Sequence, residues 1–542
     1  MTLFDVTDLA VTLHTGNRAR GRRAVRAVER ISFSVEPGQT AAIVGESGSG
    51  KSVSLLAATR LLGPQAEVTG SVRFAGHDLL GLREKVLRRI LGKDIGFVFQ
   101  DPQSNLHPFK TIGHQIDEVL RIHTRTGRGQ RRRRVEELLD EVGIADPSGA
   151  FSSYPAEFSG GMRQRAMIAM AIALNPALLI ADEPTTALDV SVQADILSLL
   201  KRLQREHGTA ILFVSHDLGV VHEIADTVTV VKDGRVVESG PRERIYEQPQ
   251  EQYTRDLLSA SLLHTVDTGH LARAVEPAGS AEPLLSVRGL RKSYPTRSRR
   301  ERRTVVDALD FTIGPAEIVG LVGESGSGKS TVGRIVAGLQ YADSGEITLS
   351  GARFPTGFGD GVPALPPAAR RDVQLVFQDP YSSLNPRRTV ARSLAEPLRA
   401  QQVDEAAIAA RVRRAADDAK LSRSLLDRYP AELSGGQRQR AAIARALVLQ
   451  PRLIVADEAL SSLDVTTQSE IISLIRQLVR EQHTAFLFIT HDLGVVSSIA
   501  HRVIVLGPDG VQESGVTSEV FANPRSAYTR KLLDAIPRLK AS

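Results

Sequence analysis

The octapeptide GESGSGKS occurs twice in this chain, at residues 45–52 and 323–330. Four further pairs of blocks recur in the same order: FVFQDP and LVFQDP, YPAEFSGG and YPAELSGG, LLIADE and LIVADE, and LFVSHDLGVV and LFITHDLGVV. The spacing between the two copies stays nearly constant from the first block to the last. Self-similarity of this kind indicates duplicated domains rather than stray motifs.

The repeat predicts two homologous domains, 1–262 and 284–542, joined by a linker at 263–283 that contains Gly and Pro but no apolar periodicity. Within each copy, short apolar runs such as TAAIVG, LLIADE and AILFVSH are typical of buried parallel strands. Amphipathic stretches such as 191–206 predict helices between these strands. The alternation predicts an α/β fold with a parallel sheet in each domain.

Composition excludes several kinds of site. The chain has no cysteine, so it cannot form disulfides, thiolate zinc sites or cysteine-ligated iron–sulfur clusters.

No run approaches the roughly 18 apolar residues that span a bilayer, and the first residues lack the pattern of a signal peptide. We therefore expect a soluble chain that reaches a membrane only through a partner. The arginine runs at 131–134 and 297–303 fit either an anionic surface or a solvated helix face or loop.

The repeated octapeptide matches the phosphate-binding pattern GxxxxGK[ST] and follows an apolar strand in both copies. Its glycines let the backbone approach phosphates closely, and its N–H groups face their negative charge. Lys51 and Lys329 are expected to reach the β- and γ-phosphates, and Ser52 and Ser330 to ligate Mg²⁺. The other predicted contacts are Gly45, Ser47, Gly48, Ser49, Gly50 and Val53, and Gly323, Ser325, Gly326, Ser327, Gly328 and Thr331.

An Asp-Glu pair ends a later apolar strand in each copy. Asp182 and Asp457 can supply a carboxylate to the metal beside the phosphate loop. Glu183 and Glu458 can orient and deprotonate an attacking water. In isolation such a pair is usually a strand-end charge, but its place in the repeated series favours catalysis.

A histidine follows the next apolar strand of each copy. His216 and His491 can donate a hydrogen bond to a γ-phosphate, although a lone histidine is more often structural. Their recurrence at equivalent strand ends favours the functional interpretation.

With the SGG blocks included, the series resembles the nucleotide-binding domain of ABC transporters over nearly the whole chain. The resemblance identifies Gln100 and Gln378 as Q-loop residues that sense the γ-phosphate and Mg²⁺, and it completes the predicted metal shells of Ser52 with Asp182 and Ser330 with Asp457. It also implies that each domain has a mainly parallel sheet core, an antiparallel β part and a helical subdomain. The domains of this family pair head to tail around two ATP molecules, each held by one phosphate loop and the other domain's signature. The predicted signature contacts are Ser159, Gly160 and Gly161, and Ser434, Gly435, Gly436 and Gln437.

Two asymmetries accompany this resemblance. The family usually stacks an aromatic residue from the first strand on adenine, and Tyr294 fits that role, whereas the first copy offers only Leu13 or His14. Met162 replaces the usual final glutamine of the first signature. Neither departure removes a catalytic group, so both sites are predicted to hydrolyse ATP.

FQDPxxxLxP after the Q-loop glutamine and the YTRxLL blocks at 253–258 and 528–533 resemble the peptide and nickel importer group. This resemblance implies an ATPase at the cytoplasmic face of the membrane, bound to two permease subunits that act with an extracytoplasmic solute-binding protein, and no nucleic acid. Peptides are the predicted solute, with nickel, glutathione or another peptide-like solute as alternatives. Many relatives carry a cysteine-ligated iron–sulfur centre, which we do not expect here.

Three other functions are less favoured. A soluble tandem ATPase acting on ribosomes or DNA would need a long charged helical linker or cysteine zinc modules, which this sequence lacks. A purely regulatory pair is disfavoured because both glutamates are present, and an exporter because no membrane span is fused to the chain.

Overall fold

Two compact units divide the chain, domain 1 ending at Leu262 and domain 2 ending at Ile536. The computed structural model describes residues 2–15, 23–186, 188–262, 282–295, 301–357, 365–379, 383–461 and 463–536. Most of the predicted linker, 263–281, lies outside the described residues.

The centre of domain 1 is a parallel sheet whose strands are buried and apolar. Its order is β6-β7-β8-β3-β9, and β10 adds an antiparallel edge beside β9. The strands are β3 (Thr40–Val44), β6 (Ile95–Val98), β7 (Leu178–Asp182), β8 (Ala210–Ser215), β9 (Thr227–Lys232) and β10 (Arg235–Pro241). The predicted strands TAAIV, LLIAD and AILFVS are therefore confirmed as β3, β7 and β8. Because β7 and β8 run parallel, their carboxyl ends bring residues 182–183 and 215–216 to one edge.

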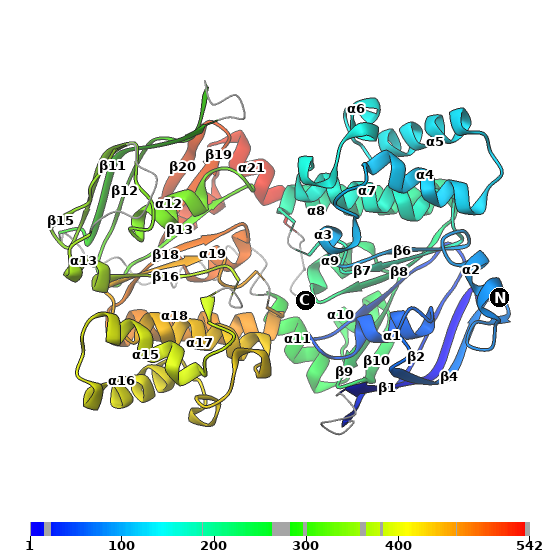
Figure 1. The fold of residues 1–542 in the computed structure, drawn as a ribbon, viewed down its shortest axis with the longest axis horizontal. Helices are drawn as coiled ribbons and strands as arrows, with labels where there is room; N and C mark the ends of the chain where they lie inside the picture. Colours follow the sequence, from blue (N-terminus) through cyan, green and yellow to red (C-terminus); the bar gives the residue numbers. More distant parts are fainter. Residues whose placement is uncertain are drawn as a thin grey trace. The chain divides into compact units, whose positions relative to one another are not determined.

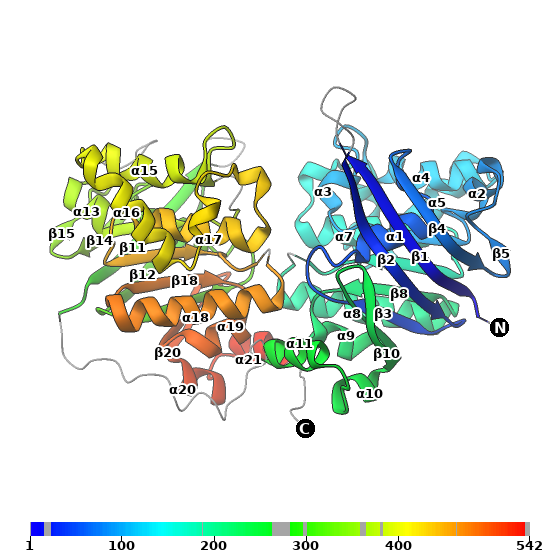
Figure 2. The same ribbon diagram turned by 90° about the horizontal axis from the view of Figure 1, so that it is seen from below.

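A second, antiparallel layer joins this sheet through the pairing of Arg235 on β10 with Arg30 on β2, giving ten strands in total. It consists of β1 (Phe4–Thr15), β2 (Arg23–Val35), β4 (Ala66–Phe74) and β5 (His77–Asp78). Figure 2 shows β1, β2 and β4 side by side as long strands.

The helices of domain 1 lie partly against the parallel sheet and partly in a separate helical group. They are α1 (Lys51–Ala58), α2 (Glu84–Ile90), α3 (Pro102–Asn105), α4 (Ile112–His123), α5 (Arg128–Glu141), α6 (Pro147–Ser152), α7 (Gly160–Ile172), α8 (Val190–His207), α9 (Leu218–Ile224), α10 (Arg242–Glu247) and α11 (Gln252–Leu262). Figure 1 shows α4, α5 and α6 together on one side of the domain, away from β1, β2 and β4. The predicted helix 191–206 is confirmed by α8.

Alternate residues of β3 divide the core into two clusters, as the two-residue period of a strand requires. Ala42 and Val44 pack with the helical part, whereas Ala41 and Ile43 pack with α1 and the antiparallel layer. The predicted helical and antiparallel parts of the domain are thus both present.

Domain 2 repeats the architecture with a six-stranded sheet in the order β16-β17-β18-β13-β19-β20 and a separate four-stranded sheet in the order β12-β11-β14-β15. The strands are β11 (Leu285–Pro295), β12 (Arg302–Ile313), β13 (Ile318–Gly323), β14 (Ser344–Leu349), β15 (Ala352–Arg353), β16 (Val373–Val376), β17 (Leu453–Asp457), β18 (Ala485–Thr490), β19 (Arg502–Gly507) and β20 (Gly510–Val516). The helices are α12 (Lys329–Val336), α13 (Pro367–Asp372), α15 (Val390–Ala400), α16 (Glu405–Asp418), α17 (Gly435–Leu447), α18 (Val465–Gln482), α19 (Leu493–Ile499), α20 (Thr517–Ala522) and α21 (Ala527–Asp534). The predicted fold class is therefore confirmed in both halves of the chain.

The arginine run 131–134 lies on α5, where ion pairs hold most of it. Arg131 Nε lies 2.7 Å from Asp117 Oδ1, and Arg132 Nε lies 3.1 Å from Glu136 Oε1. Arg134 lies within 4.0 Å of two further glutamates of the same helix. This part of the run is a charged helix face. In the described part of the chain, we find no helix with the length and apolar character needed to traverse a lipid bilayer.

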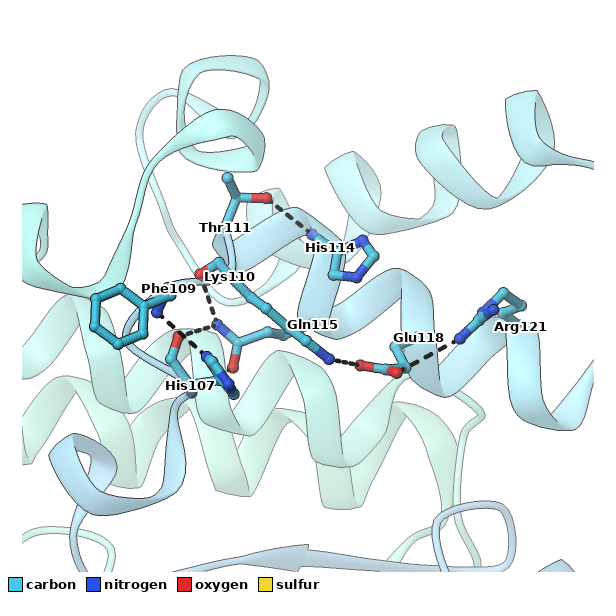
Figure 3. A network of polar contacts seen from close by, with 8 residues as sticks. All are labelled: His107, Phe109, Lys110, Thr111, His114, Gln115, Glu118 and Arg121. Atoms are coloured by element: carbon cyan, nitrogen blue, oxygen red, sulfur yellow. Dashed lines mark hydrogen bonds and ion pairs between the residues drawn. The ribbon is translucent and has the colours of Figure 1, made fainter.

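A buried glutamine shapes the segment between α3 and α4 of domain 1. Gln115 is 7% exposed, its Oε1 accepts from His107 N at 2.8 Å, and its Nε2 donates to the carbonyl oxygens of His107 (3.2 Å) and Lys110 (3.0 Å). Lys110 in turn pairs with Glu118 at 2.8 Å (Figure 3). The Gln115 side chain therefore satisfies the backbone groups of this loop from the inside, while the Phe109 side chain is 84% exposed.

Candidate nucleotide-binding sites

The predicted phosphate loop of domain 1 connects the end of β3 to the start of α1. Gly45 has φ 154°, and a Cβ there would lie 2.1 Å from the carbonyl oxygen of Val231. Gly50, the residue before α1, has φ 95°, and its Cβ would lie 2.8 Å from the carbonyl oxygen of Ala27. Only glycine fits both positions, because the backbone is left-handed and another chain segment passes close by. The glycines therefore determine the backbone conformation of the loop.

The loop of domain 2 has the same form. Gly323 has φ 152° and a Cβ there would lie 2.0 Å from the carbonyl oxygen of Leu506, and Gly328 has φ 99° with Val305 O at 2.8 Å. In both loops the remaining glycine, Gly48 or Gly326, has φ 82° and open space at its Cβ position.

Each loop lysine is buried and curls back over its own loop. Lys51 is 5% exposed, and its Nζ donates to the carbonyl oxygens of Gly45 (2.7 Å) and Glu46 (2.8 Å). Lys329 donates to the equivalent pair of oxygens, both at 2.8 Å, and burial lowers its pKa. An ammonium group so placed has positive charge to offer to an anion that enters the loop.

The hydroxyl of the next residue meets the aspartate of the Asp-Glu pair. Ser52 Oγ donates to Asp182 Oδ1 at 2.9 Å, and Ser330 Oγ donates to Asp457 Oδ1 at 2.9 Å. Burial raises the pKa of Asp182 to about 6 although Ser52 hydrogen-bonds to its charged form, and burial also raises the pKa of Asp457. A hydroxyl and a carboxylate oxygen side by side are hard oxygen donors of the kind that Mg²⁺ prefers.

Three side chains surround the carboxylate of Glu183. Gln100 Nε2 donates to Glu183 Oε2 at 2.8 Å, Thr186 Oγ donates to the same oxygen at 3.0 Å, and His216 Nδ1 lies 3.3 Å away. Burial by itself would raise the pKa of Glu183, but the hydrogen bond and charge of His216 lower it to about 2. The same ion pair raises the pKa of His216 against the effect of its burial.

The equivalent group in domain 2 differs in the carboxylate oxygen that faces the histidine and in the partner of the third side chain. Gln378 Nε2 donates to Glu458 Oε2 at 2.6 Å, and His491 Nδ1 lies 3.5 Å from Glu458 Oε1. Ser461, the counterpart of Thr186, donates instead to the backbone carbonyl of Glu458 at 3.0 Å. His491 lowers the pKa of Glu458 against the effect of burial.

Both glutamates have a left-handed backbone, with φ 47° at Glu183 and 46° at Glu458. Non-glycine residues in this region carry strain that surrounding structure must offset. Here the backbone N–H of Glu183 donates to Val214 O at 2.9 Å, and that of Glu458 donates to Ile489 O at 2.8 Å. The strained backbone turns each glutamate toward the glutamine and the histidine.

The predicted signatures form helix starts. Ser159 caps α7 by accepting from Met162 N, and Ser434 caps α17 by accepting from Gln437 N, both at 3.3 Å. Gln437 Oε1 also accepts from Ser434 N at 3.0 Å, which completes a reciprocal cap that the Met162 side chain cannot form. The signature glycines Gly161 and Gly436 pack against α8 and α18, since a Cβ there would meet Val192 or Thr467 at 2.6 Å.

Strand register decides which residue of domain 1 is the counterpart of Tyr294. Tyr294 pairs with Arg303 across β12, and Leu13 pairs with Val25 at the equivalent place on β2. The Tyr294 hydroxyl accepts from Gln340 Nε2 at 2.7 Å and lies 3.3 Å from Thr331 Oγ. An aliphatic residue therefore occupies this position in domain 1.

Within each domain, the structure thus brings together the phosphate loop, the Asp-Glu pair, the glutamine and the histidine. The sequence interpretation missed Thr186, which contacts the Glu183 carboxylate, and Tyr253 and Tyr528, which contact the phosphate loops. The repeated YTRxLL block carries the signal for the two tyrosines, since it recurs in both copies.

Comparison with known proteins agrees with this geometry. The family described as "ABC transporter" matches residues 28–186 and 306–461, and the family described as "Oligopeptide/dipeptide transporter, C-terminal region" matches residues 512–542. The chain belongs to the ATP-binding proteins of ABC transporters, so the predicted class, an ATPase that powers transport, is confirmed.

Individual relatives cover almost the whole chain. It is 44% identical over 548 residues to the glutathione import ATP-binding protein GsiA of Salmonella choleraesuis (strain SC-B67), covering 95% of this chain and 87% of that protein. It is 42% identical over 553 residues to the peptidoglycan transport ATP-binding protein YejF of Agrobacterium fabrum (strain C58 / ATCC 33970), covering 99% and 97%. A dimeric structure of the ATP-binding cassette MJ0796 with ADP and Pi is 29% identical, with a TM-score of 0.40, over 44% of this chain and 98% of that one.

Proposed function

We propose that this chain is the ATP-hydrolysing subunit of an importer for peptides or peptide-like solutes, with a nucleotide site in each domain. The observation that carries the proposal is the recurrence, in both domains, of a phosphate loop, a Ser–Asp pair and a Glu–Gln–His cluster. Relatives named for glutathione import and peptidoglycan transport, together with the oligopeptide/dipeptide C-terminal region, support the importer assignment.

The phosphate loop and its lysine would bind the triphosphate. Backbone N–H groups of the loop and the start of α1 or α12 offer hydrogen bonds and partial positive charge to phosphate oxygens. The Nζ groups of Lys51 and Lys329 donate to backbone carbonyl oxygens of the loop, and they can exchange these bonds for bonds to phosphate oxygens. The lysines therefore supply charge where it develops on the transferred phosphoryl group.

The Ser52–Asp182 and Ser330–Asp457 pairs fit Mg²⁺ by their chemistry. Gln100 and Gln378, which donate to the glutamate next to each aspartate, are the candidate third ligands. When bound, Mg²⁺ would neutralise charge on the β- and γ-phosphate oxygens. The glutamines donate to Glu183 and Glu458 and so link the metal-binding residues to the residues that act on water.

Glu183 and Glu458, which the lowered pKa keeps as ionised carboxylates, would orient the attacking water and accept its proton. His216 and His491 would hold each carboxylate in place and donate to the γ-phosphate. Tyr294 would stack on adenine in domain 2, while Leu13 would give a weaker apolar contact in domain 1. The pairing of each phosphate loop with the signature of the other domain stays a prediction from the family resemblance.

Two permease subunits and an extracytoplasmic solute-binding protein are the proposed partners, which would place this chain at the cytoplasmic face of the membrane. Assembly of the chain with its permeases in proteoliposomes tests the proposal. We expect ATP-dependent uptake of a di- or tripeptide when its binding protein is present. The Lys51→Ala/Lys329→Ala double variant is expected to abolish uptake. Peptide uptake without ATP, or uptake unchanged in that variant, would refute the proposal.

A further inference from the structure

A tyrosine from the C-terminal segment of each domain contacts the phosphate loop of that domain. Tyr253 on α11 accepts a hydrogen bond through its hydroxyl oxygen from Glu46 N at 3.3 Å. Tyr528 on α21 accepts the equivalent bond from Glu324 N at 3.3 Å. The contact therefore recurs with the same atoms in both domains, between the repeated octapeptide and the repeated YTRxLL segment.

Glu46, the second residue of the octapeptide, is hydrogen-bonded through both its carbonyl oxygen and its N–H group. The carbonyl oxygen of Glu46 accepts from Lys51 Nζ at 2.8 Å and from Ser49 N at 3.2 Å. Its N–H is held by Tyr253, from outside the loop. The bond between Glu46 N and Tyr253 does not involve the Lys51 ammonium, so it does not depend on that ammonium staying on the Glu46 carbonyl.

A buried carboxylate positions the tyrosine helix. Glu238 on β10 is 6% exposed, and its two carboxylate oxygens accept from Gln250 N at 2.9 Å and Glu251 N at 3.3 Å, directly before α11. Domain 2 repeats this arrangement, in which Glu513 accepts from Arg525 N (2.8 Å) and Ser526 N (3.1 Å). Each tyrosine therefore extends from a helix whose start is anchored to the sheet.

Domain 1 adds a contact on the tyrosine ring. Lys232 Nζ lies 4.5 Å from the centre of the Tyr253 ring, within the range of a cation–π interaction. The equivalent position of β19 is Gly507, so Tyr528 has no such cation from that strand. We expect the tyrosine of domain 1 to be held more firmly.

We propose that Tyr253 and Tyr528 are positioning residues of the two nucleotide sites, and that each hydroxyl holds the second residue of the phosphate loop in its binding shape. This inference rests on the proposed function. It gives the YTRxLL segments a part in nucleotide binding. Since the described hydrogen bond of each tyrosine goes to the phosphate loop, nucleotide affinity is the quantity that the tyrosines are expected to affect.

The test uses the full chain with Tyr253→Phe, Tyr528→Phe and the double substitution. Calorimetric titration with Mg-ATP and Mg-ADP is expected to show dissociation constants raised about 2- to 10-fold at the altered site, the value of one hydrogen bond. The KM for ATP should rise with it, while kcat at saturating ATP stays unchanged. Glu238→Gln should weaken binding in domain 1 in the same direction but less.

Tyr246→Phe is the matched control, because the Tyr246 hydroxyl donates to Leu218 O at 2.6 Å and not to the phosphate loop. We expect it to lower the melting temperature without changing nucleotide affinity. Unchanged affinity in the double variant, or an equal loss in Tyr246→Phe, would overturn the positioning role. A wild-type chain that bound neither nucleotide would instead refute the proposed function itself.

Discussion

Gln100 Nε2 donates a hydrogen bond to Glu183 Oε2 at 2.8 Å, and Gln378 donates to Glu458 in the same way at 2.6 Å. Each glutamine follows the edge strand of its sheet, β6 or β16, and each glutamate follows the neighbouring strand, β7 or β17. In both domains, this hydrogen bond connects the segment that leads to α4 or α15 with the glutamate of the Asp-Glu pair. Under the proposed function, the glutamine would report the presence of the γ-phosphate to that segment.

Replacement of either glutamate by glutamine tests whether both sites hydrolyse ATP. An amide keeps the shape of Glu183 or Glu458 but cannot accept a proton, so turnover at the altered site should fall about 100-fold or more. We expect each single variant to lower ATP hydrolysis by the assembled transporter and the double variant to abolish it, measured as phosphate release. The exposed Glu206→Gln serves as the control. If one substitution left turnover intact while the other abolished it, the two-site hypothesis would be wrong.

The reciprocal cap of α17 predicts a difference in stability. Gln437→Met removes the acceptor for Ser434 N and makes the second signature resemble the first. The free energy of unfolding of domain 2 should fall by about 0.5–1 kcal/mol, the usual value of a helix cap. Denaturant unfolding measures this change, and Gln437→Glu, which preserves the reciprocal cap, should lose less. Equal losses in the two variants would contradict the role of the cap.

The hydrogen bonds of the Gln115 side chain are expected to keep the loop that carries Phe109 rigid. Gln115→Leu keeps the volume but leaves His107 N and two carbonyl oxygens without their described partner. Buried polar groups left in this way cost about 1–3 kcal/mol. Hydrogen exchange of the His107 amide should become faster and the melting temperature should fall. Ser393→Ala in domain 2, which removes one bond to Thr389 O, should have a smaller effect; unchanged exchange in Gln115→Leu would argue against this role.

The buried position of His501 is expected to make the stability of domain 2 sensitive to acid. Its Nδ1 accepts from Ile318 N at 2.9 Å, and burial lowers its pKa, whereas Asp226 accepts from Thr40 N at the equivalent place in domain 1. A histidine whose pKa is lowered by folding makes its full contribution to the stability of the folded state when the pH is above its usual pKa of about 6.5. That stability is lost as the pH falls through the window between this value and the lower folded pKa.

His501→Asn keeps an acceptor for Ile318 N but does not titrate. We therefore expect thermal unfolding of domain 2 to depend less on pH between about 7.5 and 5.5 in this variant than in the wild type. The exposed His77→Asn is the control and should leave the profile unchanged. An identical pH profile in His501→Asn and the wild type would show that His501 does not cause the sensitivity.

The sequence by itself determined the duplication, the α/β class and most of the residues that the structure brings together around each phosphate loop. These follow from local chemistry, since a glycine-rich loop can adopt only a few backbone paths and a buried strand has a recognisable apolar pattern. Lys51, Asp182 and His216 could be assigned in this way because each lies at the end of such a strand or loop.

Only the tertiary structure decided which side chains meet across the sheet. The contact of Tyr253 with Glu46 joins residues from opposite ends of domain 1, and no local pattern specifies it. The register of β1 against β2 selected Leu13 over His14 as the counterpart of Tyr294, because register depends on the pairing of whole strands. Likewise, the consequence of Met162 became visible only as a cap that Gln437 completes and Met162 cannot.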